Sequence, residues 1–253
     1  FAEDLKQEGT ALKIVAKTDI GKVRSSNQDS YAAGELPNGV AWAVVCDGMG
    51  GNAGGNIASS TAVKMISEQI TSGYRDGMST LSIRNILTAA IQNANLSIFD
   101  MSRANEELKG MGTTVVAAIV TKNTVCVAHA GDSRAYLISH NGITQITKDH
   151  SVVQAMVETG ELTPAEAKVH PRKNLITRAL GVDDDIRVDF SEESMDNDEV
   201  LLICTDGLTN YVEVDDIYNV TSSGKYYEFA DTLVELANKN GGGDNITVVV
   251  VAY

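Results

Sequence analysis

The chain has 253 residues, of which 43% are hydrophobic, 21% are charged and only three are prolines. This balance is typical of a folded protein with a sizeable core, and it excludes a disordered or collagen-like chain. The 20 Lys and Arg against 34 Asp and Glu give a net charge of −14, which would repel a phosphate backbone, so we expect no nucleic-acid partner.

Nothing in the sequence indicates export or membrane insertion. No apolar run reaches the roughly 18 residues that a membrane helix needs, and the start, 1–9 (FAEDLKQEG), is acidic where a signal peptide is basic and then apolar. The three cysteines, Cys46, Cys126 and Cys204, form no CxxC pair and lie within apolar runs, as buried thiols of a reducing compartment do. We therefore expect a cytoplasmic protein that makes no contact with a membrane.

The first half of the chain predicts strands followed by two helices. Short β-rich runs at 12–16, 30–33 and 40–46 predict strands, and the last is nearly all apolar, as in a strand covered on both faces. Apolar residues then recur at spacings of three and four around 62–70 and, more clearly, at 83–98. This period predicts two consecutive helices, each packed on one side.

The second half begins with a further group of strands. They are predicted at 113–121, 124–130, 134–139 and 143–146. The pair Asn141-Gly142 is a hairpin signal, and a hairpin implies antiparallel pairing.

The segment 148–180 has a helical pattern that Gly160, Pro164 and Pro171 interrupt, which predicts a mobile insertion, here called the flap, over one edge of the fold. Beyond it, strands are predicted at 186–190, 200–205 and 245–252, and helices at 213–220 and 226–238. No linker or repeat divides the chain, so we expect one α+β domain over 1–253.

Five aspartates lie where predicted strands meet tight turns: Asp29, Asp47, Asp132, Asp206 and Asp244. Each alone is ordinary turn chemistry, because glycine permits a positive φ and aspartate caps its own turn. As a set they predict more, because adjacent strands are about 5 Å apart and carboxylates at their ends can converge on one sheet edge. Converging carboxylates repel each other unless a cation joins them, and oxygen ligands favour Mg²⁺ or Mn²⁺ over zinc.

Such a site predicts hydrolysis of a phosphate ester. Two ions about 3.5–4 Å apart lower the pKa of a bridging water and hold a phosphoryl group for in-line attack. Arg24 is the candidate phosphate ligand, because its planar guanidinium matches phosphate oxygens; the alternative for Arg24 is a solvated loop charge. The Gly48 carbonyl fits the same site as a further metal ligand.

The glycine-rich stretch 48–55 (GMGGNAGG) leaves a second interpretation open. Gly48, Gly50 and Ala53 satisfy the GxGxxG/A dinucleotide pattern between a strand and a helix. However, Asp47 would direct a negative charge at the pyrophosphate, and a hairpin does not suit a parallel βαβ sheet. We therefore prefer the metal site.

The four histidines give a zinc site little support, because His129, His140, His150 and His170 show neither HxxxH nor HExxH spacing. His129 is predicted to pack in a strand near Asp132. His150 and His170 lie in the flap, where they could meet a substrate, although histidines in such a segment are more often simply part of a polar surface.

Six ordered motifs run through nearly the whole chain. They are 18–30 (TDIGKVRSSNQDS), 44–55 (VVCDGMGGNAGG), 110–118 (GMGTTVVAA), 128–137 (AHAGDSRAYL), 201–208 (LLICTDGL) and 241–251 (GGGDNITVVVV). Together they resemble the metal-dependent type 2C serine/threonine protein phosphatases (PPM), most closely the compact bacterial branch. The resemblance implies a four-layer αββα sandwich, with two antiparallel sheets flanked by helix pairs and a metal pair at one end between the sheets.

The resemblance also implies the metal ligands. Asp47 would bridge two Mn²⁺ or Mg²⁺ ions, Asp206 and Asp244 would complete one site, and the Gly48 carbonyl would bind the other ion. Asp132 would join Asp206 in a weaker third site beside the flap.

The implied reaction is hydrolysis of phosphoserine or phosphothreonine in proteins by a water or hydroxide that bridges the two ions, which reverses a cognate Ser/Thr kinase. Asp29 would act on this water or contribute directly to the groups around the metal, and Arg24 would hold the phosphate. Three positions depart from relatives: Gln28 replaces a Glu, Met49 a candidate general-acid His, and Asn52 a His. The departures leave the proton donor open, and the alternative function is a non-catalytic module of the same fold that binds phosphoprotein or metal.

Overall fold

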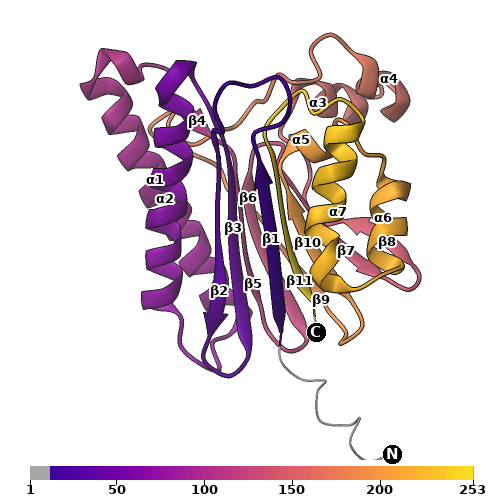
Figure 1. Ribbon diagram of the computed structural model, residues 1–253. Coiled ribbons are helices and arrows are strands. Elements are labelled where there is room, and N and C mark those ends of the chain that lie inside the picture. Colours follow the sequence, from indigo (N-terminus) through magenta and orange to yellow (C-terminus); the bar gives the residue numbers. More distant parts are fainter. Residues whose placement is uncertain (1–11, 253) are drawn as a thin grey trace, which may run out of the picture.

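The computed structural model describes residues 12–252, apart from the side chains of residues 52 and 53, so the acidic start that argued against a signal peptide lies outside the described residues. Two antiparallel sheets pack face to face, and helices cover both outer faces (Figure 1). This arrangement confirms the predicted α+β sandwich of two antiparallel sheets flanked by helices.

The first sheet has the strand order β1-β11-β10-β7-β8, and all neighbours are antiparallel. Its strands are β1 (Lys13–Asp19), β7 (Arg134–Ser139), β8 (Gly142–Gln145), β10 (Val200–Cys204) and β11 (Ile246–Ala252). All seven residues of β11 are buried between β1 and β10, which explains the continuous apolar sequence of this strand. Because β1 and β11 come from opposite ends of the chain, their pairing ties the whole sandwich together.

The second sheet has the order β2-β3-β5-β6-β9, with β4 paired to the end of β3. Its strands are β2 (Asp29–Leu36), β3 (Val40–Met49), β4 (Gly112–Thr113), β5 (Val115–Val120), β6 (Thr124–Ala130) and β9 (Asp189–Ser194). The register of β2 and β3 sets Asp29 opposite Asp47. The sheet itself therefore brings two of the predicted site residues together.

Two helix pairs cover the outer faces of the sheets. Helices α1 (Gly51–Gly73) and α2 (Thr80–Ala104) pack on the second sheet, and α6 (Val214–Ser222) and α7 (Tyr226–Lys239) pack on the first (Figure 1). The short helices η1 (Glu106–Leu108) and α5 (Asp206–Thr209) lie between the larger elements. Alternate residues of β3 face different apolar layers, since Val44 packs toward the helices and Val45 packs between the sheets.

The segment predicted as a flap, 148–180, contains α3 (Val152–Glu158) and α4 (Pro164–Val169), at the same end of the sandwich as α5 (Figure 1). Helix α4 begins with a capping box of Thr163 and Glu166, and Pro164 occupies its first turn. Single β-bridges, Ser151 to Ile176 and Thr113 to Leu180, attach the flap to itself and to the sandwich.

The expected strand at 186–190 is wrong in its bounds. Pairing with β6 begins only at Asp189, opposite His129, and continues to Ser194. The apolar alternation misled because Ile186 and Val188 pack against the core beneath the helices from a loop rather than from a strand.

Two predictions from the sequence concern membrane-spanning segments and the environment of the cysteines. Among the residues that the structure describes, no helix has both the length and the apolar character for crossing a membrane. The cysteines Cys46, Cys126 and Cys204 are all buried and free. Their place in the core explains why each lies in an apolar run.

Candidate active site

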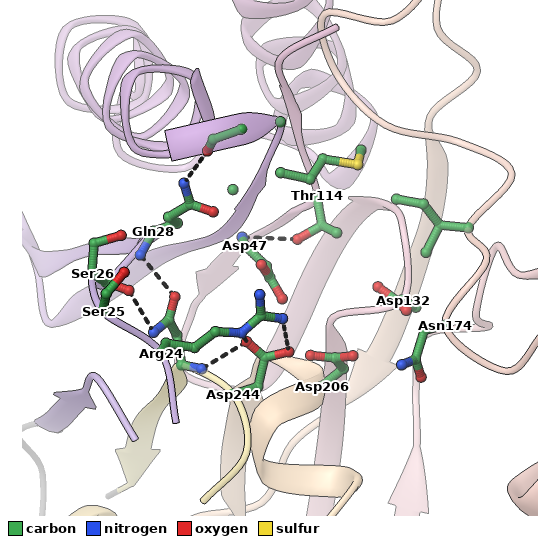
Figure 2. Close-up of a pocket in the computed structure, with 16 residues that line it drawn as sticks. Arg24, Ser25, Ser26, Gln28, Asp47, Thr114, Asp132, Asn174, Asp206 and Asp244 are labelled. Carbon is green, nitrogen blue, oxygen red and sulfur yellow. Dashed lines mark hydrogen bonds and ion pairs between the residues drawn. The ribbon is translucent and has the colours of Figure 1, made fainter. Parts of the chain in front are cut away.

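A cavity of about 470 Å³ opens at one end of the sandwich, beside the flap. Six of the seven predicted site residues line it: Arg24, Asp47, Gly48, Asp132, Asp206 and Asp244. Figure 2 shows that the carboxylates of the four aspartates point toward one another from different segments of the chain. The seventh residue, Asp29, lies behind Asp47 on the neighbouring strand.

The convergence follows from where each element begins or ends. Asp47 lies near the end of β3, Asp132 in the turn between β6 and β7, and Asp206 at the first position of α5, directly after β10. Asp244 precedes β11. Both sheets therefore contribute carboxylates to one end of the sandwich, whereas the strand ends alone predicted convergence at one sheet edge.

Asp29 is buried, with 7% of its surface exposed. The hydroxyls of Thr205 and Thr247 donate hydrogen bonds to its Oδ2 over 2.9 and 2.7 Å. Its Oδ1 is buried and has no partner among the described residues. Burial, followed by the nearby charges of Asp206 and Asp244, raises the pKa of Asp29 to about 7 against the lowering effect of the two hydroxyls.

Asp47, Asp132 and Asp206 also resist ionisation. Burial and then the charges of Asp29 and Asp206 hold the pKa of Asp47 well above its ordinary value. Burial and then Asp206 raise the pKa of Asp132 to about 8, and burial and then Asp244 raise the pKa of Asp206. Four acids that destabilise each other's charged forms are an unfavourable arrangement unless a cation balances them.

The residues present fit a hard divalent metal. Asp206 Oδ1, like Asp29 Oδ1, is buried without a hydrogen-bond partner in the described part of the chain, while Asp206 Oδ2 accepts a hydrogen bond from Asn210 over 2.9 Å. Unpaired buried carboxylate oxygens normally belong to an ion or to a protonated acid. A donor set made entirely of oxygen suits Mn²⁺ or Mg²⁺.

Gly48 is required by close packing. A Cβ atom at this position would lie 2.1 Å from the Gly55 carbonyl oxygen and 2.6 Å from that of Gln28. The first turn of α1 thus packs directly on the end of β3, and this close approach explains the glycine-rich sequence. Because β3 pairs antiparallel with both β2 and β5, the dinucleotide alternative lacks the parallel βαβ unit that it needs.

Arg24 lies at the rim of the cavity with its side chain about half exposed, and its guanidinium forms a bidentate ion pair with Asp244. Nη2 and Nε lie 2.8 Å from Oδ2 and Oδ1 of that carboxylate. The loop that carries Arg24 is fixed by Asn245, whose Nδ2 donates to the carbonyls of Ile20 and Ser26 over 3.0 Å each. Arg24 is therefore not a freely solvated loop charge.

Several supporting residues were not predicted from the sequence. Thr114 Oγ1 accepts a hydrogen bond from the Asp47 N–H over 3.0 Å, and Asn245 orders two segments around the cavity. Asn174 and Ile176 reach the cavity from the flap. Thr114 and Asn245 lie within the motifs 110–118 and 241–251, but the motifs alone assign them no role, and Asn174 and Ile176 lie outside all six motifs. Only the tertiary fold shows that these residues meet at the site.

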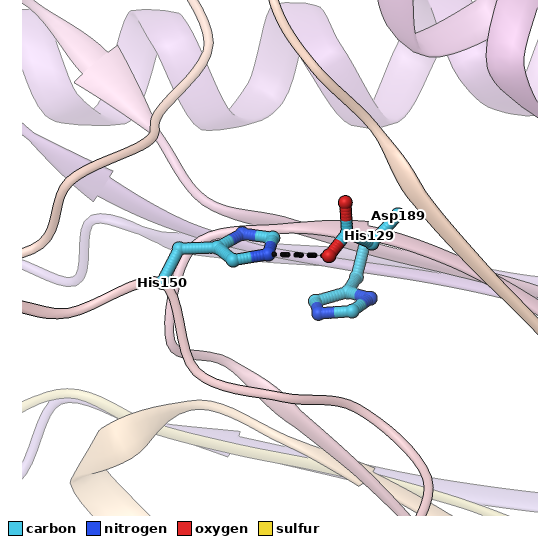
Figure 3. Close-up of side chains that lie close together, drawn as sticks. All are labelled: His129, His150 and Asp189. Atoms are coloured by element: carbon cyan, nitrogen blue, oxygen red, sulfur yellow. Dashed lines mark hydrogen bonds and ion pairs between the residues drawn. The ribbon is translucent and has the colours of Figure 1, made fainter. Parts of the chain in front are cut away.

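A second cluster consists of His129, His150 and Asp189, of which His150 belongs to the start of the flap (Figure 3). The two rings stack, with centroids 4.7 Å apart. The Gly131 N–H donates to Nδ1 of His150 over 3.1 Å, and Nε2 of the same ring lies 3.1 Å from Asp189 Oδ2 and 2.9 Å from Arg178 Nη1. Asp189 also accepts a hydrogen bond from Arg178 over 2.9 Å.

This cluster supports the site and is poorly suited to a metal of its own. His150 already uses both ring nitrogens, and the positive charge of Arg178 lies against Asp189. His150 holds Gly131 through two hydrogen bonds, and Gly131 directly precedes Asp132. The expectation that His150 could meet a substrate is wrong, because only 6% of its surface is exposed.

Fold and site together define a class of protein. Clustered carboxylates that suit divalent metal ions, with a guanidinium at the rim of an open cavity, are the groups that a metal-dependent phosphate ester hydrolase needs.

Comparisons with known proteins give the family. The family model described as Protein phosphatase 2C matches residues 21–247. The chain is 39% identical over 241 residues to "Serine/threonine phosphatase stp" of Listeria welshimeri, with 93% of each chain covered. The chain therefore belongs to the protein phosphatase 2C family, the metal-dependent protein serine/threonine phosphatases, as the six motifs predicted.

Solved structures agree with this assignment. The structure of the S. agalactiae serine/threonine phosphatase superposes with a TM-score of 0.89 at 34% identity, covering 95% of this chain and 99% of that chain. The catalytic domain of the serine/threonine protein phosphatase PstP, solved in complex with 2 manganese ions, superposes with a TM-score of 0.82 at 33% identity, covering 95% and 97%.

The carboxylate cluster predicts that the metal-free protein loses stability as the pH rises. The folded-state pKa values of Asp29 and Asp132, about 7 and about 8, lie above the value of about 3.9 expected in the unfolded chain. The folded state thus binds more protons, so this stabilisation is complete below pH 4 and is lost as the pH rises through 7 and 8. Thermal unfolding in EDTA should show a melting temperature that falls between pH 6 and pH 8.5.

Two controls separate this effect from general titration. The Asp132→Asn variant should show a smaller decline over the same range, and excess Mn²⁺ should raise the melting temperature more at pH 8.5 than at pH 6. A melting temperature in EDTA that rises with pH across this range would contradict the account.

Gly48→Ala should destabilise the protein by about 1–3 kcal/mol, because the new methyl group would force the backbones of β3 and α1 apart. Gly73→Ala is the matched control, since a Cβ there meets only ordinary contacts with Ile86 at 3.7 Å or more. Chemical denaturation of both variants measures the difference. Equal stabilities for the two variants would contradict the claim that close packing at Gly48 leaves no room for a methyl group.

Proposed function

We propose that this chain removes phosphate from phosphoserine and phosphothreonine side chains of proteins, using divalent metal ions held by the aspartates of the cavity. The observation that supports it most is the convergence of Asp47, Asp132, Asp206 and Asp244, whose mutual repulsion a cation would relieve. The family relationship supports the same reaction, and PstP has been solved with 2 manganese ions.

In this proposal Asp47, Asp206, Asp244 and the Gly48 carbonyl hold two Mn²⁺ or Mg²⁺ ions, and Asp132 joins Asp206 at a weaker third site. When bound, the ions lower the pKa of a coordinated water and stabilise negative charge on the phosphoryl oxygens. Asp29 lies next to Asp47, and its unpaired Oδ1 is the atom that accepts a proton in this scheme.

Arg24 is the proposed phosphate ligand. Its planar guanidinium already grips a carboxylate through two hydrogen bonds, and phosphate oxygens offer the same bidentate geometry. Asp244 would also be a metal ligand in this proposal, so Arg24 and a metal would share one carboxylate. A guanidinium that leaves Asp244 would be free to bind phosphate at the rim of the cavity.

The aspartates of the cavity are assigned to metal and Arg24 to phosphate in this proposal, which leaves no other titratable side chain in the described lining to give the leaving oxygen a proton. Met49 lines the cavity and has no proton to donate, and the flap residues that reach it, Asn174 and Ile176, do not titrate. We therefore assign this role to solvent water within the cavity.

The proposal extends to the setting of the enzyme. Phosphoprotein substrates imply a cognate Ser/Thr kinase as the opposing activity, and three free, buried cysteines are in keeping with a cytoplasmic protein. We also treat the chain as one phosphatase domain with a flap over 148–180, because each sheet takes strands from distant parts of the sequence.

Asp206→Asn should abolish turnover, because it removes a charge from the centre of the metal site. The assay is phosphate release from a phosphothreonine peptide in Mn²⁺ and after chelation with EDTA, with a phosphotyrosine peptide alongside. Asp76→Asn makes the same change at an exposed turn and should retain wild-type activity. Near-normal turnover by Asp206→Asn at modest Mn²⁺ would overturn the assignment, and a folded wild-type protein without metal-dependent release would favour the non-catalytic module.

Arg24→Ala should mainly raise the KM for the phosphopeptide, because the interaction lost is with bound phosphate. Since Arg24 and a metal would share Asp244, the variant should bind Mn²⁺ at least as tightly as the wild type. Steady-state kinetics and calorimetric titration measure the two effects separately. An unchanged KM would remove Arg24 from the phosphate site, and weakened Mn²⁺ binding would contradict the claim that Arg24 and a metal share Asp244.

A further inference from the structure

A groove of about 280 Å³ adjoins the active-site cavity. The two share Met49 and Ile176 as lining residues, so the groove begins where one wall of the cavity ends. Its far side is formed by the segment 182–187, which joins the flap to β9.

The groove has an apolar surface that is only partly covered. Ala179 and Ile186 are almost fully buried, with 8% and 6% of their surfaces exposed. Val182, in contrast, is 52% exposed beside them. An apolar side chain laid along this surface would remove Val182 from water.

The free charge at the groove is negative. Arg178 and Arg187 both direct their guanidinium groups at Asp189, over 2.9 and 3.5 Å. Asp183 and Asp185 are exposed and form no ion pair with any residue that the structure describes. The two arginines thus share the single negative charge of Asp189, while the charges of Asp183 and Asp185 are unpaired among the described residues, so acidic groups outnumber basic groups along the groove.

The backbone of the groove is held in place from α2. The buried side chain of Asn95 donates from Nδ2 to the carbonyls of Asp183 and Asp184, over 3.0 and 3.3 Å. Its Oδ1 accepts a hydrogen bond from the Gly181 N–H over 2.8 Å. A surface fixed in this way can bind a peptide without a large ordering cost.

We propose that this groove binds the residues that flank the phosphorylated side chain of the substrate, and that it favours a flank combining an apolar residue with a Lys or Arg. The inference rests on the proposed function. A phosphorylated residue in the cavity places its neighbours at about 3.5 Å per residue along an extended chain, and Met49 and Ile176 connect cavity and groove directly. The apolar residue contacts Val182, and the basic residue pairs with Asp183 or Asp185.

The test uses phosphothreonine peptides that differ only in their flanks: Leu-Lys, Leu-Glu and Gly-Lys, each placed before or after the phosphothreonine. The wild-type protein should give the highest kcat/KM for one of the Leu-Lys peptides and the lowest for its Leu-Glu counterpart. In the double variant Asp183→Asn/Asp185→Asn, kcat/KM for the Leu-Lys peptide should fall about two- to tenfold, as the loss of exposed ion pairs allows. Val182→Ser should reduce the advantage of Leu over Gly.

Two controls keep this result distinct from the proposed function. Hydrolysis of p-nitrophenyl phosphate, which has no flanking residues, should be unchanged in the groove variants and also shows that they are folded. The double variant Glu68→Gln/Asp76→Asn removes the same charge around the far end of α1 and should keep the wild-type preference.

The outcomes separate cleanly. If the wild-type protein hydrolyses all peptides equally well whatever their flank, the proposed role of the groove is wrong. It is also wrong if the preference for the Leu-Lys flank survives in Asp183→Asn/Asp185→Asn. A wild-type protein that releases no phosphate from any peptide or from p-nitrophenyl phosphate overturns the proposed function itself.

Discussion

The central physical constraint in this structure is the mutual repulsion of acidic groups. The fold holds these groups together at one end of the sandwich. Burial and neighbouring charges raise the pKa values of Asp29, Asp47, Asp132 and Asp206, so these groups are strained as anions unless positive charge accompanies them. The surrounding architecture keeps them from moving apart. The β2–β3 register pairs Asp29 with Asp47, and the packing of β3 between two apolar layers fixes the strand that carries Asp47. Because the acidic groups of such a site are fixed close together, the site favours the binding of divalent cations.

Arg24 and the flap both contact the segments that carry these acidic groups. Arg24 pairs with Asp244 at the rim, and His150 joins the flap to Gly131, next to Asp132. The flap also continues into the segment that forms the groove beside the cavity. In the functions proposed above, this end of the sandwich would combine carboxylates that hold metal, a guanidinium that holds phosphate and a fixed surface that binds the substrate chain.

Much of this could be predicted from the sequence, because the strongest signals are local. Strands covered on both faces are continuous apolar runs, as in β3 and β11, and the buried side of α2 follows the helical period. The aspartates were predicted as a set because strand ends meet. The rest depends on contacts between distant residues: the ion pair of Arg24 with Asp244, 220 residues away, the hydroxyls that hold Asp29, and the burial of His150. The predicted start of β9 was wrong because the alternation of apolar residues begins in the preceding loop, whose apolar side chains also pack on the core.

The most direct test of the account is calorimetric titration of metal-free protein with Mn²⁺ at pH 7 in buffers of different ionisation enthalpy. Carboxyl groups with raised pKa values must give up protons to bind metal, so binding should be accompanied by proton release that declines as the pH rises toward 9. At least two ions should bind per chain, and Asp47→Asn should lose the tight sites. Mn²⁺ binding without proton release, or tight binding that survives Asp47→Asn, would contradict the claim that these carboxylates form the metal centre.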